Sequence, residues 1–245
     1  SAADMEFACK AGSEAMQTAV AFVGSGMAEY ALAIGMDATQ SKPGDALEYT
    51  AAAGGAAYIF GPAEDSLAIV EASYSHVTDT PDFFRRQHMH YPEHGHRFTG
   101  LPAYLSHTQE ATQALMDLTS ARPSDYDWAV FHQPNPKFPR RVAHTLGFTD
   151  KQILPGLVVD SIGNTYSGSS LLGLAAVFDI AKKGDRIFFC SYGSGAGSDA
   201  FSMVVNGDLV NVRDHAPTVR DYLSRSHVLN DYGQYLRHSR KIRLL

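Results

Sequence analysis

Small and apolar residues recur with helical spacing in four stretches of the chain. Ala15, Ala19, Phe22 and Val23 form a narrow stripe that predicts a helix over 10–24, ended by Gly24. An amphipathic pattern predicts a helix over 103–120, and a basic segment predicts one over 138–146. Residues 169–182 are small or apolar nearly all round, which predicts a buried helix.

Short apolar runs between these stretches predict strands. They cover 30–34, 56–60, 67–72, 128–131, 158–159, 186–192 and 200–205. We expect 30–34 to be buried, and 56–60 to pair with 67–72 through a turn at Gly61-Pro62. Residues 80–100 are rich in His, Pro and aromatics and predict a surface excursion. Alternating strands and helices indicate an α/β layered fold.

Composition and charge exclude several classes of function. The chain has 245 residues, 44% of them hydrophobic and 19% charged, which is a globular composition. Charges or glycines interrupt every long apolar run, so no segment is expected to span a membrane. A net charge of −6 argues against nonspecific binding of nucleic acid. The two cysteines cannot build a disulfide framework, so a reducing, cytoplasmic setting is expected.

Cys9 is the first candidate for chemistry because it lies immediately before the first small-residue helix. The positive end of a helix dipole stabilises a thiolate and lowers its pKa. Free N–H groups at the same end could hold an oxyanion after the thiolate attacks a carbonyl. The alternative is a buried cysteine with a purely structural role.

His132 and Asn164 follow strand-like segments. His132 ends the apolar run WAVF, at the edge of a sheet where α/β proteins place ligands, and could bind a carbonyl or act as a base. Asn164 precedes the second buried helix and could direct its amide at a carbonyl. The structural alternatives are a core histidine with satisfied hydrogen bonds and an asparagine that caps a turn.

Three other features have a structural and a functional interpretation. The glycine-rich SYGSGAGSDAF lacks the Lys of a phosphate-binding P-loop, and it favours either a hairpin or close approach to a ligand. Lys137, with Arg140 and Arg141, could hold a phosphorylated ligand or form a solvated helix face. A histidine-rich segment could bind a metal, but it has no Cys and no His-Glu-x-x-His, so we expect no metal site. The residues of this segment that could bind a metal are His88, His90, Glu93, His94 and His96.

Taken in chain order, these motifs resemble the thiolase superfamily, and within it the hydroxymethylglutaryl-CoA synthases of the archaeal and bacterial type. The resemblance covers essentially the whole chain. It implies a thiolase-like αβαβα layered fold built from two similar halves. The segments that carry it are EFACKAG, DTPDFFRR to YPEHGHRFTG, FHQPNPKFP, GNTYSGSSLLGLAAV, YGSGAGSDAF and DYGQYLRHSRKIR.

The resemblance implies residue roles and a reaction. Cys9 matches the nucleophile that acetyl-CoA acetylates, His132 the histidine that holds the acetoacetyl-CoA carbonyl, and Asn164 the active-site amide. Ser194 matches a residue near the acyl group and Lys137 one near the CoA phosphates; Gly193 and Tyr166 are expected to bind the CoA substrates. The product is 3-hydroxy-3-methylglutaryl-CoA, an intermediate of the mevalonate pathway of isoprenoid biosynthesis. No cofactor is expected beyond the coenzyme A thioesters used as substrates.

One departure from the family pattern concerns the general acid/base. In the family this glutamate precedes the nucleophile, whereas only eight residues precede Cys9 here and Glu6 is too close to match it. We therefore expect 1–100 to hold the end of the N-terminal half plus an excursion loop, and 101–245 the C-terminal half and tail. The opening part of the first half is expected from another chain or segment. A homodimer, an acetoacetyl-CoA thiolase and an OB-fold protein are the other partners implied.

Two alternatives share the fold. One is an acyltransferase subunit of the ketoacyl-ACP synthase III or diacetylphloroglucinol type, which a different acyl acceptor would distinguish. The other is a non-catalytic scaffold subunit of a thiolase complex, which predicts no acetyl group on Cys9.

Overall fold

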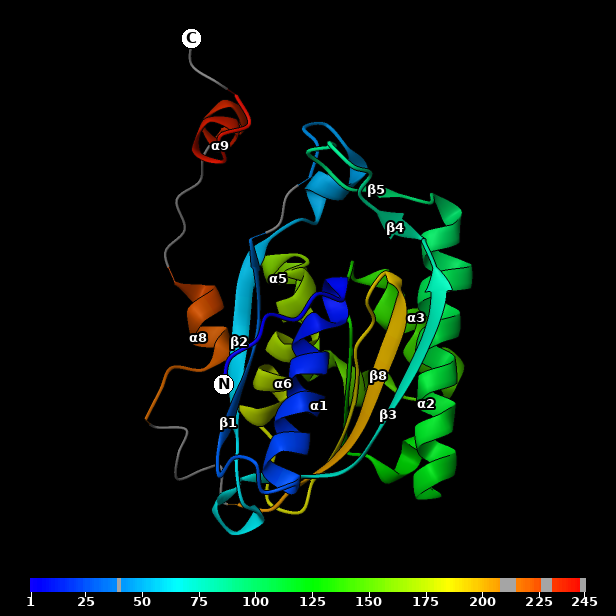
Figure 1. Cartoon of the computed structure of the whole chain (residues 1–245), viewed down its shortest axis with the longest axis vertical. Helices are drawn as coiled ribbons and strands as arrows, with labels where there is room; N and C mark the ends of the chain where they lie inside the picture. The colour runs from blue at the N-terminus through cyan, green and yellow to red at the C-terminus, as the bar shows by residue number, and fades with distance from the viewer. Residues whose placement is uncertain (39–40, 208–214, 226–230, 243–245) are drawn as a thin grey trace.

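The chain folds into stacked layers of sheets and helices (Figure 1). The computed structural model describes residues 1–38, 41–207, 215–225 and 231–242. A two-stranded sheet packs on a central pair of helices, α1 and α6, which separate it from a four-stranded sheet. Helices α2 and α3 cover the far face of the larger sheet. The predicted α/β layered class is confirmed.

Helix α1, Ala11–Gly24, follows a 3-10 turn over Ala8–Lys10 and ends at the predicted glycine. Its first turn needs glycine. A Cβ on Gly12 would lie 2.5 Å from the carbonyl oxygen of Ser167, and one on Gly35 would lie 2.6 Å from the same atom. The absence of side chains therefore lets α1, strand β1 and the loop before α6 approach at backbone distance.

Strand β1, Ala31–Ala38, pairs antiparallel with β2, Ala53–Phe60. The expectation of a short buried strand over 30–34 is wrong in length and in burial. Inward residues such as Ala33 pack on α1, whereas the outward side chains Leu32, Ile34 and Met36 are 59%, 54% and 71% exposed. The apolar run looked fully buried because both faces of the strand are hydrophobic.

The four-stranded sheet has the order β3-β8-β7-β6. Its strands are β3 Ala68–Thr80, β6 Trp128–Phe131, β7 Arg186–Cys190 and β8 Gly195–Val205. β6 and β7 are parallel and the other pairs are antiparallel. The expected pairing of 56–60 with 67–72 is wrong, because β2 pairs with β1 and β3 with β8. The connection at 61–67 contains a 3-10 turn, Ala63–Asp65, and carries the chain from one sheet to the other.

Helices cover both faces of this larger sheet. Buried α6, Ser169–Phe178, ends four residues earlier than predicted and lies with α1 between the sheets. On the far face, a π-helical turn Thr99–Leu105 leads into α2, Ser106–Thr119, and α3 spans Lys137–Leu146. Both outer helices lie where the sequence predicts them, and α2 packs on β3 and β8.

The strand predicted at 158–159 is wrong, because Val159–Ile162 form the short helix α5. The side-chain oxygen of buried Gln133 accepts hydrogen bonds from the backbone N–H groups of Val158 and Val159, at 2.9 and 3.0 Å. These amides therefore need no strand partner.

The remaining elements are short. Within the irregular 80–100 segment, β4 Phe83–Phe84 pairs with β5 Glu93–His94. Helix α4 spans Asp150–Ile153, and the tail contains α8 Val219–Ser224 and α9 Tyr232–His238. None of the helices in the described ranges is long and apolar enough to cross a membrane.

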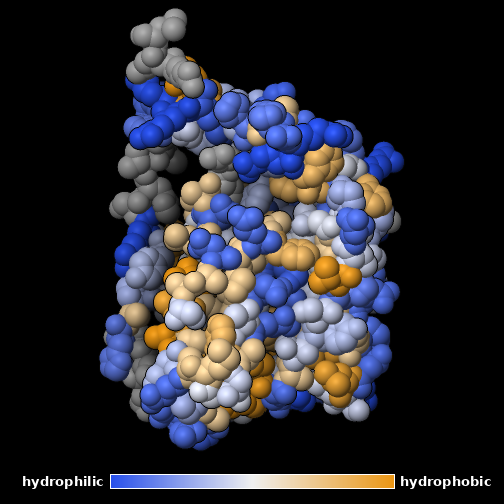
Figure 2. Space-filling view, in the orientation of Figure 1, coloured by the Kyte–Doolittle hydropathy of each residue, from blue (hydrophilic) through white to orange (hydrophobic). Residues whose placement is uncertain are grey.

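The order helix, strand, antiparallel strand occurs twice, as α1–β1–β2 and as α6–β7–β8. β7 and β8 have outer neighbours, β6 and β3. Within the described part of the chain, β1 and β2 pair only with each other. Figure 2 shows hydrophobic residues gathered over α1 and the adjoining β1–β2 side. The smaller sheet thus has open edges on β1 and β2 and an apolar outer face, whereas β7 and β8 are flanked by strands on both sides.

The tight packing at Gly12 gives a first prediction. Gly12→Ala should lower the free energy of unfolding by about 1–3 kcal/mol, because the new methyl group meets a backbone oxygen that cannot rotate away. The matched control is Gly24→Ala in the same helix, where a Cβ meets nothing within 4 Å. That variant should gain up to about 1 kcal/mol from helix propensity. Urea unfolding of both proteins measures the difference, and equal midpoints would contradict the packing argument.

Candidate active site

Cys9 lies in a strained turn. It occupies the 3-10 turn before α1 and is 6% exposed. Its predecessor Ala8 has φ +43°, in the left-handed region that non-glycine residues rarely adopt. The glycine-rich loop presses against this turn, since a Cβ on Gly193 would lie 2.5 Å from the carbonyl oxygen of Phe7. The turn that carries Cys9 is therefore packed against the glycine-rich loop at backbone distance.

The electrostatic environment of Cys9 differs from the sequence expectation. Burial raises the pKa of the thiol well above its usual range, and the carboxylates of Asp37 and Asp82 raise it further. The predicted lowering of this pKa by the helix N-terminus is wrong, because desolvation of the thiolate outweighs the favourable field of one helix end. The thiol is thus protonated at neutral pH in this structure.

His132 stands at the end of β6, as predicted, and is 2% exposed. Its backbone N–H donates to the carbonyl of Cys190 at 2.9 Å, and its carbonyl accepts from the hydroxyl of Tyr104 at 2.8 Å. Burial lowers its pKa to about 3, so the imidazole is neutral at physiological pH. Among the described residues, its buried Nδ1 has no hydrogen-bond partner. A neutral ring with an unused nitrogen is suited to binding a ligand or exchanging a proton.

Asn164 is fixed by its backbone. Its N–H donates to the carbonyl of Thr50 at 2.6 Å, and its carbonyl accepts from the N–H of Ala52 at 3.0 Å. Its side-chain oxygen accepts from the N–H of Tyr166 at 2.9 Å, so part of its amide supports a local turn. Tyr166 has φ +49°, and burial and the nearby Cys9 raise the pKa of its hydroxyl. The loop before α6 therefore faces the nucleophile.

Asp82 organises the glycine-rich loop, and the sequence interpretation did not single it out. This fully buried carboxylate accepts hydrogen bonds from the Tyr192 hydroxyl at 2.6 Å, the Ser194 hydroxyl at 3.1 Å and the Gly195 N–H at 2.9 Å. Tyr192 also packs near His132, with ring centroids 6.3 Å apart. The only signal for Asp82 was its place in DTPDFFRR. A carboxylate in an irregular segment looks like a surface residue until the fold covers it.

Most of the predicted site residues meet at one place. Electrostatic interactions connect Cys9 with Asp82, Tyr166 and Tyr192. The ring of Tyr192 packs near that of His132, and Asp82 accepts hydrogen bonds from both Tyr192 and Ser194. Lys137 is different, because it is exposed at the first turn of α3. Its backbone N–H donates to Asn135, and in the described part of the chain no hydrogen bond or ion pair joins Lys137 to the other site residues.

The histidine-rich segment does not form a metal cluster. Its closest ring pair is His94 with His96, at 5.3 Å between centroids. Over the residues that the structure describes, no group of three or more His, Cys, Asp or Glu side chains is arranged to hold a metal ion.

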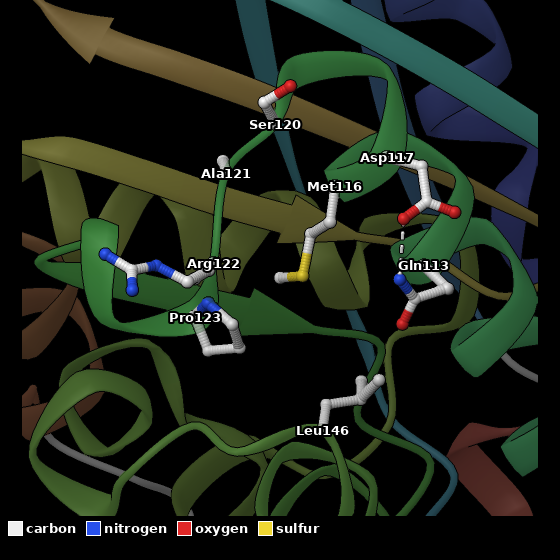
Figure 3. Close-up of a pocket in the computed structure, with 8 residues that line it drawn as sticks. All are labelled: Gln113, Met116, Asp117, Ser120, Ala121, Arg122, Pro123 and Leu146. Atoms are coloured by element: carbon white, nitrogen blue, oxygen red, sulfur yellow. Dashed lines mark hydrogen bonds between the residues drawn. The ribbon is translucent and has the colours of Figure 1, made fainter.

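Two other hollows lie away from these residues. A cavity of about 530 Å³ at the end of α2 is lined by residues that include Gln113, Met116, Arg122 and Leu146. Figure 3 shows the hydrogen bond from Gln113 Nε2 to Asp117 Oδ1 at its wall. A larger apolar groove of about 700 Å³ runs between α1, β2 and the start of β3. Neither includes Cys9 or His132.

Comparisons of sequence identify relatives over nearly the whole chain. Residues 116–206 match the family model described as 3-oxoacyl-[acyl-carrier-protein (ACP)] synthase III C terminal. Hydroxymethylglutaryl-CoA synthase of Pyrococcus furiosus is 59% identical over 98% of this chain and 69% of its own length. Hydroxymethylglutaryl-CoA synthase of Methanococcoides burtonii is 58% identical over 99% of this chain and 70% of its own.

Solved structures share the fold at lower sequence identity. MvaS in complex with 3-hydroxy-3-methylglutaryl coenzyme A superposes with a TM-score of 0.83 at 21% identity, over 95% of this chain and 65% of that one. An HMG-CoA synthase complexed with CoA superposes with a TM-score of 0.73 at 22% identity, over 84% of this chain and 57% of that one. The chain therefore spans about two thirds of the length of its sequence relatives and somewhat less of these structures. With 59% identity across nearly all of its residues, the chain belongs to the hydroxymethylglutaryl-CoA synthase family.

Proposed function

We propose that this chain carries the nucleophile and the acceptor-binding histidine of an acyl-CoA condensing enzyme. The reaction converts acetyl-CoA, acetoacetyl-CoA and water into 3-hydroxy-3-methylglutaryl-CoA and CoA through acetyl-Cys9. The observation that carries the proposal is the placement of a buried thiol and a neutral histidine with an unused Nδ1 around one tyrosine, Tyr192. Membership of the family supports the same reaction.

The first step is acetyl transfer to Cys9. The thiol loses its proton to a base, the sulfur attacks the acetyl carbonyl carbon, and the CoA thiolate leaves and is protonated. Because burial raises the pKa of the free thiol, proton transfer must accompany the approach of the thioester. The N–H groups of Lys10 and Ala11 already donate to the carbonyls of Phe7 and Ala8, so the N–H of Cys9 itself is the proposed donor for the carbonyl oxygen.

The second step joins two carbons. A base removes a proton from the methyl group of acetyl-Cys9, and the resulting carbanion adds to the ketone carbon of acetoacetyl-CoA. His132 holds that ketone oxygen and stabilises the alkoxide that forms. A neutral imidazole does this with its single N–H, so the low pKa of His132 is compatible with the role. Water then cleaves the Cys9 thioester and leaves the free carboxylate of the product.

The remaining site residues hold the substrates in this proposal. Asn164 directs its amide at the acyl group, Tyr166 and Gly193 line the pocket, and Ser194 lies near the acyl group through its bond to Asp82. The family resemblance assigns a CoA phosphate to Lys137, and the exposure of its side chain is compatible with that role. The coenzyme A thioesters are substrates, and the proposed steps use no other cofactor.

The base of the second step is proposed to come from outside these 245 residues. The open edges of β1 and β2 and their exposed apolar face support a companion segment that completes the smaller sheet. We retain the division into the end of an N-terminal half with its excursion, 1–100, and a C-terminal half with the tail, 101–245. In this division β3 already belongs to the sheet of the second half.

Further partners follow from the family resemblance. We propose a homodimer of the completed unit, working beside an acetoacetyl-CoA thiolase and an OB-fold protein in the mevalonate pathway. Direct transfer of acetoacetyl-CoA would draw the unfavourable thiolase equilibrium forward. Two cysteines without a disulfide support a cytoplasmic setting.

A second candidate function is acyl transfer of the ketoacyl-ACP synthase III type. The match of residues 116–206 to that family model favours it. Both reactions begin with an acyl-Cys9, so the acceptor distinguishes them. Release of acyl-Cys9 by acetoacetyl-CoA supports the synthase, and release only by an acylated carrier protein supports the alternative.

Cys9→Ala should abolish covalent labelling by radioactive acetyl-CoA, because the other cysteine of the chain, Cys190, is fully buried. Cys190→Ala is the matched control, since Cys190 is fully buried in β7 and should leave labelling intact. Intact mass spectrometry of the native preparation reads the label and weighs any companion chain. Labelling that persists in Cys9→Ala would refute the nucleophile, and an unlabelled wild-type chain beside a companion would favour a scaffold.

His132→Ala should leave acetylation of Cys9 largely intact and slow condensation by about 10²–10³-fold, the usual cost of removing an oxyanion donor. Single-turnover assays separate the two steps: labelled acetyl-enzyme is formed first and then mixed with acetoacetyl-CoA. A variant that blocks acetylation and spares condensation would reverse the assigned roles.

The low pKa of His132 predicts acid sensitivity. Between pH 6.5, the ordinary pKa of histidine, and about pH 3, the pKa of His132 in the fold, the unfolded state binds a proton and the folded state does not. The free energy of unfolding therefore falls as the pH falls through this range. At pH 5 the wild-type protein should have lost about 2 kcal/mol more free energy of unfolding, relative to pH 7, than His132→Gln. Urea unfolding at both pH values measures this, and parallel losses in the two proteins would contradict burial of the neutral ring.

A further inference from the structure

We propose that Lys10 is a positioning residue for Cys9: its buried ammonium, paired with Asp199, holds the nucleophile turn against the larger sheet. The effect on acetyl transfer rests on the proposed function, whereas the effect on the turn does not. Nothing in the proposed mechanism uses the charge of Lys10, although this residue is the direct neighbour of the nucleophile.

Lys10 is completely buried, which is rare for a lysine. Its ammonium contacts the carboxylate of Asp199 at 3.1 Å and that of Glu14 one turn along the helix. It also lies over the ring of Phe7, 4.4 Å from the centroid. The cation is therefore directed away from solvent by three groups, two of them in its own segment.

Asp199 connects this cation to the larger sheet. It is fully buried on β8 and accepts hydrogen bonds from Ser75 of β3 at 2.6 Å and from Ser13 of α1 at 2.5 Å. Ser13 also lies 2.5 Å from the hydroxyl of Ser191, at the end of β7. One carboxylate thus links the first turn of α1 to β8 and β3, and Ser13 extends the network to the residue after β7.

The Lys10–Asp199 pair lies next to a turn whose backbone conformation is unfavourable by itself. Ala8 adopts its left-handed φ one residue before Cys9, and such a conformation persists only where surrounding contacts impose it. Those contacts centre on Lys10. A Cβ on Gly193 would lie 2.7 Å from the Lys10 backbone nitrogen, and one on Gly197 would lie 3.0 Å from its Cε. The glycine-rich loop and the nucleophile turn therefore pack together on the Lys10 side chain.

A buried ion pair is weak evidence of stabilisation, because desolvation offsets the attraction. A solvated lysine at this position would avoid that cost, so stability alone does not explain the burial. Control of the geometry at Cys9 does explain it, since an error of about 1 Å at a reacting atom can cost 10²-fold in rate.

The test uses Lys10→Met combined with Asp199→Asn. Lys10→Met alone leaves a buried carboxylate unpaired and can prevent folding, whereas the double variant removes both charges and keeps most hydrogen bonds. Lys183→Met is the matched control, the same substitution at an exposed lysine. In each full-length protein, time-resolved mass spectrometry follows alkylation of Cys9 and Cys190 by iodoacetamide, and a radioactive assay follows acetyl transfer from acetyl-CoA.

The fully buried Cys190 reports on global structure in the same molecule. We expect the double variant to expose Cys9, so that its alkylation rises several-fold while Cys190 stays protected, and to slow acetylation by about 10²-fold. The proposal is overturned if Cys9 reacts at the wild-type rate, or if both cysteines become reactive together, as general unfolding would cause. If wild-type Cys9 accepts no acetyl group, the proposed function fails, but the alkylation comparison still decides the role of Lys10.

Discussion

The arrangement of the site depends on one backbone contact, the approach of Gly12 and Gly35 to the carbonyl of Ser167. A methyl carbon on Gly12 would lie 2.5 Å from that oxygen, and one on Gly35 would lie 2.6 Å from it, so the layers would have to separate. Because the contact holds, the helix after Cys9, the strand that carries Asp37 and the loop that carries Asn164 and Tyr166 converge. The chemistry is thus positioned by residues that have no functional groups.

Convergence also removes water, and this sets the electrostatics of the site. Burial raises the pKa of Cys9 and lowers that of His132, so the favoured state has a neutral thiol and a neutral imidazole, both near Tyr192. Such a pair avoids the cost of isolated buried charges. It also means that the enzyme does not store a reactive thiolate. Charge is expected to form only when a thioester supplies an electrophile, which protects the nucleophile from unwanted reactions in the absence of substrate.

Much of this could be predicted from the sequence, and the failures have a common cause. Helical periodicity located α1, α2 and α3, and the run WAVF located β6, because these signals are local. Strand pairing failed at β2 and β3, because the Gly-Pro turn between them was misleading: β2 pairs with the preceding strand β1, and β3 pairs with β8, which is distant in sequence. Cys9, His132 and Asn164 were found through their motifs. Asp82 and Lys10 were missed because a charged residue gives no sign in sequence that tertiary contacts will bury it.

The two sides of the nucleophile turn are held by different means. On one side, the Lys10–Asp199 pair and the loop at Gly193 tie it to a sheet with every inner strand paired. On the other side, β1 brings Asp37 toward the thiol, but β1 belongs to a sheet with two open edges among the described residues. A segment that paired with those edges would stiffen β1 and bring new side chains to the Asp37 side of Cys9. The base proposed for the second step would then reach Cys9 from the smaller sheet, since the four-stranded sheet already supplies His132 and the anchor for the nucleophile.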